Sequence, residues 1–225
     1  MMNRKMPWFA AALIGVGVSA FGQEQTVVKR GVYNREPAVV SEIRTREVQL
    51  HREPTAGIQS CAIALVPGLE VPSPEWSITA FRFDVLLGRH HSVSGVDFGI
   101  VGNLVDYDLA GFGFAAGFND CGMADSAFQL AGVFNHVSWN YRGLQVAGGA
   151  NVVEGELTGM QMAVFNSAER LKGLQLGAIN STTCGSGVQV GVINTTERLK
   201  GVQIGAINII RESSFPFLPI INCAF

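Results

Sequence analysis

The residues best suited to chemistry in this chain are two neighbouring histidines, His90 and His91. Neutral imidazole is the commonest protein ligand of metal ions, so the pair is a candidate metal site. Adjacent side chains reach one ion only from a bent loop, and this pair follows Gly88 and Arg89 in a connector. The H-x-x-x-H and H-E-x-x-H spacings of metal sites do not occur. We therefore interpret the two histidines as polar loop residues and predict no metal ligands.

Glycines and carboxylates give no better candidate for catalysis. The segment Gly111-Phe112-Gly113, with Gly117 after it, resembles a phosphate-binding loop, but no Lys-Ser or Lys-Thr pair follows it. The carboxylates Asp106, Asp108 and Asp120 lie in connectors without a partner base. A serine hydrolase needs a strained nucleophile elbow, and its motif is missing. We predict a protein that is not an enzyme, with no catalytic residues and no cofactor.

One polar residue type, glutamine, recurs at a fixed position along the second half of the chain. A regular amide series of this kind is typical of a hydrogen-bonding ladder or of the lining of a lumen. We favour those roles over ligand recognition. The series is Gln129, Gln145, Gln161, Gln175, Gln189 and Gln203.

The glutamines belong to an internal repeat, whose clearest copy is Gly201–Asn208 with the sequence GVQIGAIN. Tracing the opening residue upstream and downstream gives ten copies, the first and last degenerate, as is usual for terminal repeats. The spacing is 15 or 16 residues up to Gly159 and 14 residues after it. The opening residues are Ala80, Gly95, Gly111, Ala127, Gly143, Gly159, Gly173, Gly187, Gly201 and Phe215.

Within each copy, apolar side chains alternate with small or polar ones. Leu174 and Leu176 share one face of their segment, while Gly173, Gln175 and Gly177 share the other. A period of two indicates a β-strand, and the aliphatic and aromatic residues favour the same structure. We predict an all-β fold of ten repeated strands, with the Gly-Gln-Gly face directed inward.

The residue before each opening position indicates a longer unit. It carries a hydroxyl group in alternate copies, such as Ser186, and is basic in copies on either side of that one. The segments Glu169–Lys172 and Glu197–Lys200 both read Glu-Arg-Leu-Lys and are two copies apart. We infer a unit of two strands, 28 to 32 residues long, with successive connectors on opposite sides of the structure.

Two architectures satisfy this pattern. The preferred one is an up-and-down antiparallel β-barrel in the outer membrane, because the strand number is even and closure removes exposed edges. Its last strand would alternate up to the C-terminal residue, as the residues Phe215, Phe217, Pro219, Ile221, Cys223 and Phe225 do. The alternative is a two-sheet β-solenoid in which each pair of strands makes one turn and like strands stack in parallel.

One length argues against the barrel. The outward face from Val188 to Val192 covers five residues, or about 16 Å at about 3.3 Å per residue. Outer-membrane barrels have an apolar band about 25 Å tall with aromatic girdles, and the chain contains only three Trp and three Tyr. The solenoid therefore stays open as the alternative.

The N-terminal part of the chain differs from the repeats. Residues 1–22 have the basic start, the apolar run Trp8–Phe21 and the small residues before a cleavage site that are typical of a secretory signal peptide. Residues 23–56 mix charges of both signs with hardly any aromatic residues, and we interpret them as a charged, partly disordered arm. The β-repeat domain is predicted over residues 57–225, with copies from about residue 79.

Composition narrows the classes of partner. The net charge of -2 gives no electrostatic footprint for nucleic acid. The four cysteines are far apart and include no C-x-x-C pair, so a zinc or redox site is disfavoured. We interpret them as small buried or half-buried residues: Cys61, Cys121, Cys184 and Cys223.

The repeats resemble those of a group of exported bacterial surface-repeat proteins. The resemblance rests on copies such as Gly173–Asn180 (GLQLGAIN) and the longer variant Phe128–Asn135 (FQLAGVFN). It also includes a first strand at Phe81–Gly88 and an end at Phe217–Phe225, and it covers residues 57–225. It implies export and a place at the cell surface or in the outer membrane, and it brings no catalytic residues to this chain.

These observations together predict a non-enzymatic envelope protein, either an outer-membrane β-barrel or a surface structural component. Outer-membrane lipid is the expected partner, with a surface ligand or protein partner left unidentified. The alternative is a secreted β-solenoid that presents a binding face to another molecule. In both cases we expect an exported protein, in the outer membrane or at the surface of a bacterial cell.

Overall fold

The computed structural model describes residues 57–224, so the predicted signal peptide, the charged arm and Phe225 lie outside the described residues. All regular structure in this part of the chain is β-strand, as predicted, and it contains no helix. The strands are β1 (Ile58–Val66), β2 (Leu69–Val71), β3 (Ser77–Asp84), β4 (Leu87–Gly99), β5 (Gly102–Ala115), β6 (Phe118–Ala131), β7 (Phe134–Val137), β8 (Tyr141–Ala147), β9 (Ala150–Met162), β10 (Phe165–Leu176), β11 (Ile179–Val190), β12 (Ile193–Ile210) and β13 (Phe217–Ala224).

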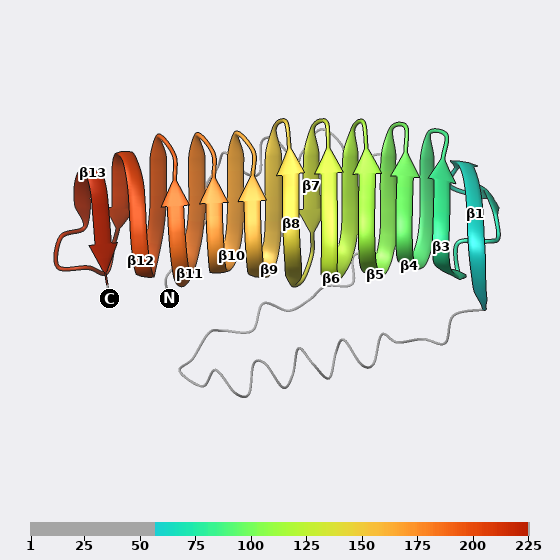
Figure 1. Ribbon diagram of the computed structural model, residues 1–225, viewed down its shortest axis with the longest axis horizontal. Helices are drawn as coiled ribbons and strands as arrows, with labels where there is room; N and C mark the ends of the chain where they lie inside the picture. Colours follow the sequence, from blue (N-terminus) through green and yellow to red (C-terminus); the bar gives the residue numbers. More distant parts are fainter. Residues whose placement is uncertain (1–56, 225) are drawn as a thin grey trace, which may run out of the picture. The chain divides into compact units, whose positions relative to one another are not determined.

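Successive copies of the repeat pair in parallel from β3 to β12, so the strands stack side by side along one axis (Figure 1). Between β10 and β11, Gly173 pairs with Gly187 and Gln175 pairs with Gln189, which are equivalent positions of neighbouring copies. Parallel neighbours require the chain to return to its starting side between them. The chain makes this return within every copy, and the fold is therefore a β-solenoid of stacked coils.

The predicted antiparallel barrel is thus wrong. An up-and-down barrel pairs neighbouring strands antiparallel and closes the last strand onto the first. Here the sheet runs open from β13 at one end to β2 at the other, and its antiparallel pairs are β12 with β13 and β1 with β2, at the two ends. The solenoid alternative is correct as a class, but its unit is different from the one predicted. One copy of 14 to 16 residues makes a complete turn, not two copies.

In most copies the backbone turns at the glycine that opens the copy. Gly159, Gly173 and Gly187 have φ angles of +135°, +143° and +146°, which glycine adopts readily and other residues do not. A Cβ atom on Gly173 would also collide with the carbonyl oxygen of Gly159 in the previous coil. The opening glycines, Gly111 included, therefore lie within the strands and form corners of the coil.

The alternation of hydroxyl and basic residues has a different cause from the one inferred. Lys172 pairs with Ser186 and Ser186 with Lys200, so the three residues follow each other in one column on the same side of the stack. Neighbouring coils are about 4.8 Å apart, so a lysine in every coil would face strong repulsion. An intervening serine doubles that spacing to about 10 Å. The period of two copies is therefore an electrostatic pattern on the surface.

The change from 16-residue to 14-residue copies falls at the corners. One extra residue lies between Val153 and Leu157, compared with Ala168 to Leu171. The other lies between Val146 and Ala150, compared with Met162 to Phe165. Because the extra residues are accommodated at bulges, the side chains of long and short coils stay in register.

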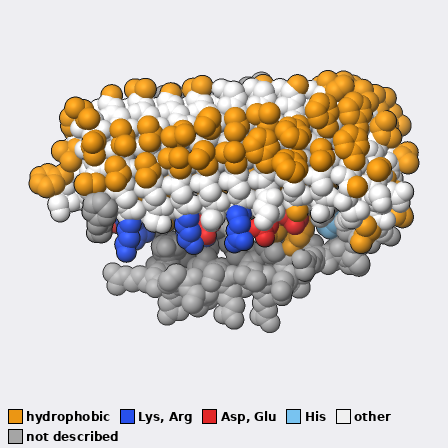
Figure 2. Space-filling model, in the orientation of Figure 1, with side chains coloured by type: hydrophobic (Ala, Val, Ile, Leu, Met, Phe, Trp, Pro, Cys, Tyr) orange, Lys and Arg blue, Asp and Glu red, His pale blue; other side chains and the backbone are white. Residues whose placement is uncertain are grey.

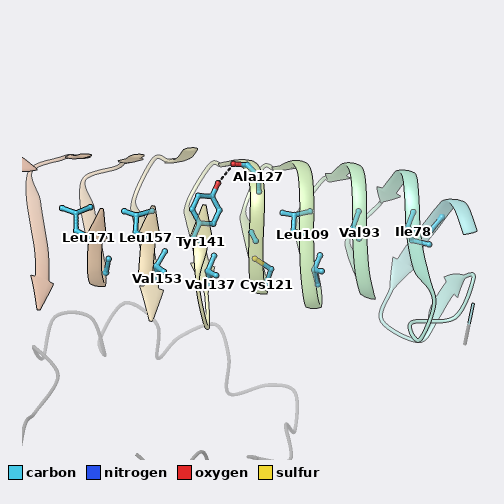
Figure 3. Packing of buried hydrophobic residues seen from close by; sticks show 14 residues of the cluster. Ile78, Val93, Leu109, Cys121, Ala127, Val137, Tyr141, Val153, Leu157 and Leu171 are labelled. Carbon is cyan, nitrogen blue, oxygen red and sulfur yellow. Dashed lines mark hydrogen bonds between the residues drawn. The ribbon is translucent and has the colours of Figure 1, made fainter. Parts of the chain in front are cut away.

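Apolar side chains fill the interior of the coils in two stacked columns (Figure 3). The hydroxyl group of Tyr141 donates a hydrogen bond to the carbonyl oxygen of Ala127 at 2.8 Å, so its polar atom is satisfied inside the core. Burial of this surface is the main stabilising term, at about 25 cal/mol per Å². The core includes Ile78, Val93, Leu109, Cys121, Val137, Tyr141, Val153, Leu157 and Leu171.

Two columns of buried amides complete the interior. In the Gln column, each Nε2 from Gln145 to Gln203 donates to the Oε1 of the preceding coil at 2.7–3.0 Å, which confirms the predicted ladder and the inward direction of the glutamines. In the Asn column, each Nδ2 from Asn103 to Asn194 donates to the Oδ1 of the following coil at 2.8–3.1 Å. The two ladders therefore run in opposite directions along the stack. The Asn column consists of Asn103, Asn119, Asn135, Asn151, Asn166, Asn180, Asn194 and Asn208.

Candidate interaction face

The structure separates the two candidate histidines, which lie within strand β4 and not in a connector. His90 is buried, and its Nδ1 accepts a hydrogen bond from Arg82 while its Nε2 donates to the carbonyl oxygen of Pro72, each at 3.3 Å. The ring of His91 stacks on Tyr107, with 5.6 Å between the ring centroids. Successive residues of a strand point to opposite faces, so the two rings cannot share one ion.

Two of the carboxylates considered as catalytic candidates form ion pairs with residues of neighbouring coils. Asp106 pairs with Arg89 and Asp120 with His136, in both cases at 2.8 Å. Burial lowers the pKa of His136, but the hydrogen bonds with Asp120 and Glu154 outweigh it and raise this pKa to about 10. Within residues 57–224, no group of three or more His, Cys, Asp or Glu side chains is arranged to hold a metal ion.

A cluster of buried charges closes the Gln column at its N-terminal end. Arg82 and Asp97 occupy the glutamine position of the first coils, and the Arg82 guanidinium donates to both carboxylate oxygens of Asp97 at 2.6 and 2.7 Å. Asp84 lies 3.1 Å from Arg82 Nε, and burial raises the pKa of Asp84 to about 7 although the Arg82 charge opposes this. Burial and then the Arg82 charge lower the pKa of His90 to about 4, so His90 is neutral. The cluster is enclosed and serves the interior.

The outward side chains between the corner glycine and the next turn form two exposed columns, which we call the apolar face. Each coil contributes one row of two residues to this face. The two residues of a row lie immediately before and after the inward residue of the Gln column. Strand pairing places eleven rows in register. In order along the stack they are Cys61/Ile63, Phe81/Phe83, Val96/Phe98, Phe112/Phe114, Phe128/Leu130, Leu144/Val146, Met160/Met162, Leu174/Leu176, Val188/Val190, Val202/Ile204 and Cys223/Ile221.

The apolar face contains no charged or amide side chain in any of its rows. Its exposure is substantial, at 50% for Phe112, 42% for Met162 and 41% for Ile204. At one end the aromatic rings pack against each other, for example Phe114 against Phe128 with centroids 5.8 Å apart. Figure 2 shows the resulting rows of hydrophobic side chains along the stack. The supposed phosphate loop thus contributes Phe112 to an apolar surface and Gly111 to a corner.

The apolar surface continues around the turn that follows the second column. Val133, Val164 and Val192 are more than half exposed at this edge of the coils. Exposed apolar patches of more than a few hundred Å² are uncommon on soluble monomers and mark binding sites. The candidate site of this molecule is therefore a flat, continuous surface.

Charged side chains lie beyond the corner glycines, on the other side of the first column (Figure 2). They are largely paired within the stack: Lys172 lies 2.9 Å and Arg170 3.5 Å from Glu156, and Arg198 lies 3.5 Å from Glu212. Exposed pairs of this kind contribute little stability. Their position marks the edge of the apolar face beyond the first column.

The sequence pattern indicated most of this face but missed its first row. Cys61 and Ile63 of β1 pair with Phe81 and Phe83, so a further row precedes the first predicted copy. The alternation of Cys61 and Ile63 with buried Ala62 and Ala64 is the signal that could have revealed it. At the other end, β13 runs antiparallel and presents Ile221 and Cys223, so the tenth copy does not begin at Phe215 in phase with the others.

The stacked coils, the amide ladders and the apolar face define this chain as a β-solenoid repeat protein. Comparisons with protein-family models, with curated proteins and with solved structures give no match to it. Residues 57–224 also contain no helix that is long and apolar enough to cross a membrane.

Proposed function

We propose that this chain is a non-enzymatic, exported component of a bacterial cell envelope that acts through its apolar face as a structural or binding surface. The observation that carries this proposal is the face itself, with its aligned rows of exposed apolar side chains. Keeping such a surface in water has a free-energy cost, which is removed when a partner covers it.

The roles of the polar groups support a function without catalysis. His90, Arg82 and Asp97 bond to one another or to the backbone inside the first coils, and the glutamines bond to each other. Arg89 and Asp106 neutralise each other at the surface. These side chains hold the stack together, so its regular outer surface is the feature left for function.

Export and envelope placement rest on two sequence features. The signal peptide predicted at residues 1–22 directs the chain out of the cytoplasm. The resemblance of the repeats to exported surface-repeat proteins supports the same compartment. The net charge of -2 and the paired surface charges favour an apolar envelope partner, lipid or protein, over nucleic acid.

The test is fractionation of cells that express the full chain, with Leu130→Asp and Met162→Asp combined in one variant. Both residues are about 40% exposed on the apolar face, so the two charges should release the chain from the envelope fraction into the soluble exported fraction. Ser186→Asp, which adds a charge beyond the corner glycine, is the control and should stay in the envelope. Equal envelope retention of the double variant would contradict the role of the face, and wild-type chain in the cytoplasm would contradict export.

A further inference from the structure

The side chains of the apolar face change in size along the stack. The rows near the N-terminal end are aromatic, with Phe112 beside Phe114, whereas those near the C-terminal end are small, with Val188 beside Val190. The row Leu144/Val146 lies at the middle, with five rows on each side of it. A partner that covers the whole face must therefore be thin at one end and thick at the other.

The geometry points to a second copy of this chain as the occupant, packed face to face with its stack antiparallel to the first. This inference rests on the proposed role of the apolar face and names its partner. A two-fold axis along the strands and through the row Leu144/Val146 places the rows that contain phenylalanine over aliphatic or methionine rows. The row Phe112/Phe114 then faces Leu174/Leu176 of the second copy.

The other two-fold arrangement does not give this match. With the axis along the stack, every coil would face its own copy, so Phe112 and Phe114 would meet the same two rings of the second copy. Val188 and Val190 would meet valines. Packed sheets keep a nearly constant separation of about 10 Å and fill it closely. Phe against Phe at one end and Val against Val at the other would leave a wedge-shaped gap.

The area and the spacing also fit a second copy. Ten steps of about 4.8 Å give a face about 48 Å long, and three residues of about 3.3 Å give a width of about 10 Å. The pair would bury about 1,000 Å² before the relief of the side chains is counted, which is about the minimum area of a biological interface. Both copies have the same row spacing, so every row of one copy lies over a row of the other along the entire length. The absence of charge from the face of residues 61–223 leaves no like charges to repel.

The antiparallel arrangement makes a specific geometric prediction about the end rows. Cys61 lies in the first column of the first row and Cys223 in the first column of the last, and both are exposed free cysteines. The two-fold axis along the strands keeps the first column over the first column. It therefore brings Cys61 of each copy opposite Cys223 of the other, at two places in the dimer.

The first test is the mass of the purified full chain at micromolar concentration, by light scattering and sedimentation. We expect a dimer for the wild type, monomer for Met162→Asp with an unchanged circular dichroism spectrum, and dimer for the matched control Val164→Asp at the edge of the same coil. A monomeric wild type overturns the inference. If that monomer still binds phosphatidylethanolamine–phosphatidylglycerol vesicles through the face, the proposed function stands with lipid as partner; if it binds nothing, both fail.

The second test does not depend on the folding of a charged variant. All chains carry Cys184→Ser, so that Cys61 and Cys223 are the exposed cysteines. A short bismaleimide should join two chains that retain both cysteines through Cys61 of one and Cys223 of the other, as identified by mass spectrometry of the linked peptides. Cys61→Ser alone and Cys223→Ser alone should give no linked dimer, and a mixture of the two variants should restore it. Linkage of Cys223→Ser chains through Cys61 of both copies, or a dimer without the 61–223 linkage, overturns the antiparallel arrangement.

Discussion

At the scale of single residues, the buried amides hold neighbouring coils in register. Asn180 donates to Asn194 at 2.8 Å and accepts from Asn166 at 3.0 Å, and it also donates to the carbonyl oxygen of Val190. At the start of the column the Oδ1 of Asn103 accepts no hydrogen bond from residues 57–224. Replacing an asparagine inside the column therefore leaves amide groups of two neighbouring asparagines without a ladder hydrogen bond, whereas replacing Asn103 at the end affects only one neighbour.

We expect Asn180→Ala to lower the free energy of unfolding by about 2–4 kcal/mol, because it removes two ladder bonds and leaves buried amide atoms without partners. Asn103→Ala removes one ladder bond at the end of the column and should cost about 1–2 kcal/mol. Urea unfolding of both variants measures the difference. Equal costs at the two positions would show that the ladder bonds do not stabilise the stack.

Asp84 should give the stability of the folded chain a pH dependence. Its pKa is raised from the ordinary value of 3.8 to about 7, so between these values the folded state holds a proton that the unfolded state has lost. Stability contributed by the neutral carboxyl group is then full below about pH 4 and declines as the pH rises to about 7. Asp84→Asn should be more stable than the wild type by about 1–3 kcal/mol at pH 8 and about equal to it at pH 4.

Urea unfolding at pH 4, 6 and 8 tests this expectation. Asp106→Asn is the control, since Asp106 lies in a half-exposed ion pair with Arg89 and its loss should have a small effect. A difference between Asp84→Asn and wild type that is the same at every pH would mean that Asp84 does not hold its proton in the folded chain.

At the scale of the element, most coils have a glycine at the corner, in a backbone conformation that other residues rarely adopt. Gly111 has a φ of +117°, and a Cβ atom there would collide with the carbonyl oxygen of Gly95 in the previous coil. Two residues later, Gly113 lies in an ordinary strand conformation, and its Cβ would lie 3.2 Å from the flexible end of Leu109. The two glycines look alike in the sequence and have different roles in the coil.

Gly111→Ala should therefore lower the free energy of unfolding by about 3 kcal/mol or more, through backbone strain and the clash with a neighbouring coil. Gly113→Ala should change it by about 1 kcal/mol at most, because the leucine side chain can shift. Thermal unfolding followed by circular dichroism compares them. Similar losses for both alanines would exclude a special role for the corner.

At the scale of the whole molecule, the stack is one-dimensional, since each coil contacts its neighbours through the same columns. Both ends are closed by departures from the pattern. β13 runs antiparallel to β12 and carries Pro219, which cannot donate to a further strand, and β2 runs antiparallel to β1. A coil between these two ends can therefore be added or removed without changing the structure of the other coils.

Deletion of residues 180–193 removes one coil and joins Ile179 to Asn194, which restores the repeat. We expect this variant to fold, with its midpoint of thermal unfolding lowered by only a few degrees. Deletion of residues 180–186 removes half a coil and puts Gly187 and Gln189 out of register, so the C-terminal coils should unfold. Limited proteolysis and circular dichroism distinguish the two. A folded, protease-resistant half-coil variant would contradict one copy per turn.

The sequence by itself was sufficient for the repeat, for the β class and for the inward direction of Gln175 and its equivalents, because period two is a local property of the strand. The outward rows of the apolar face could be identified in the same way, from Leu174 and Leu176 onward.

Only the tertiary structure decided the path of the chain between strands. Gly173 can continue a strand or turn a corner with equal ease, so its identity does not tell whether successive copies run antiparallel or stack in parallel. The alternation of Lys172, Ser186 and Lys200 pointed to opposite sides, whereas charge spacing within one column explains it. Rows contributed by β1 and by the reversed β13 likewise depend on pairing between distant segments. Strand pairing is a long-range choice, and the local pattern of residues is compatible with both of its outcomes.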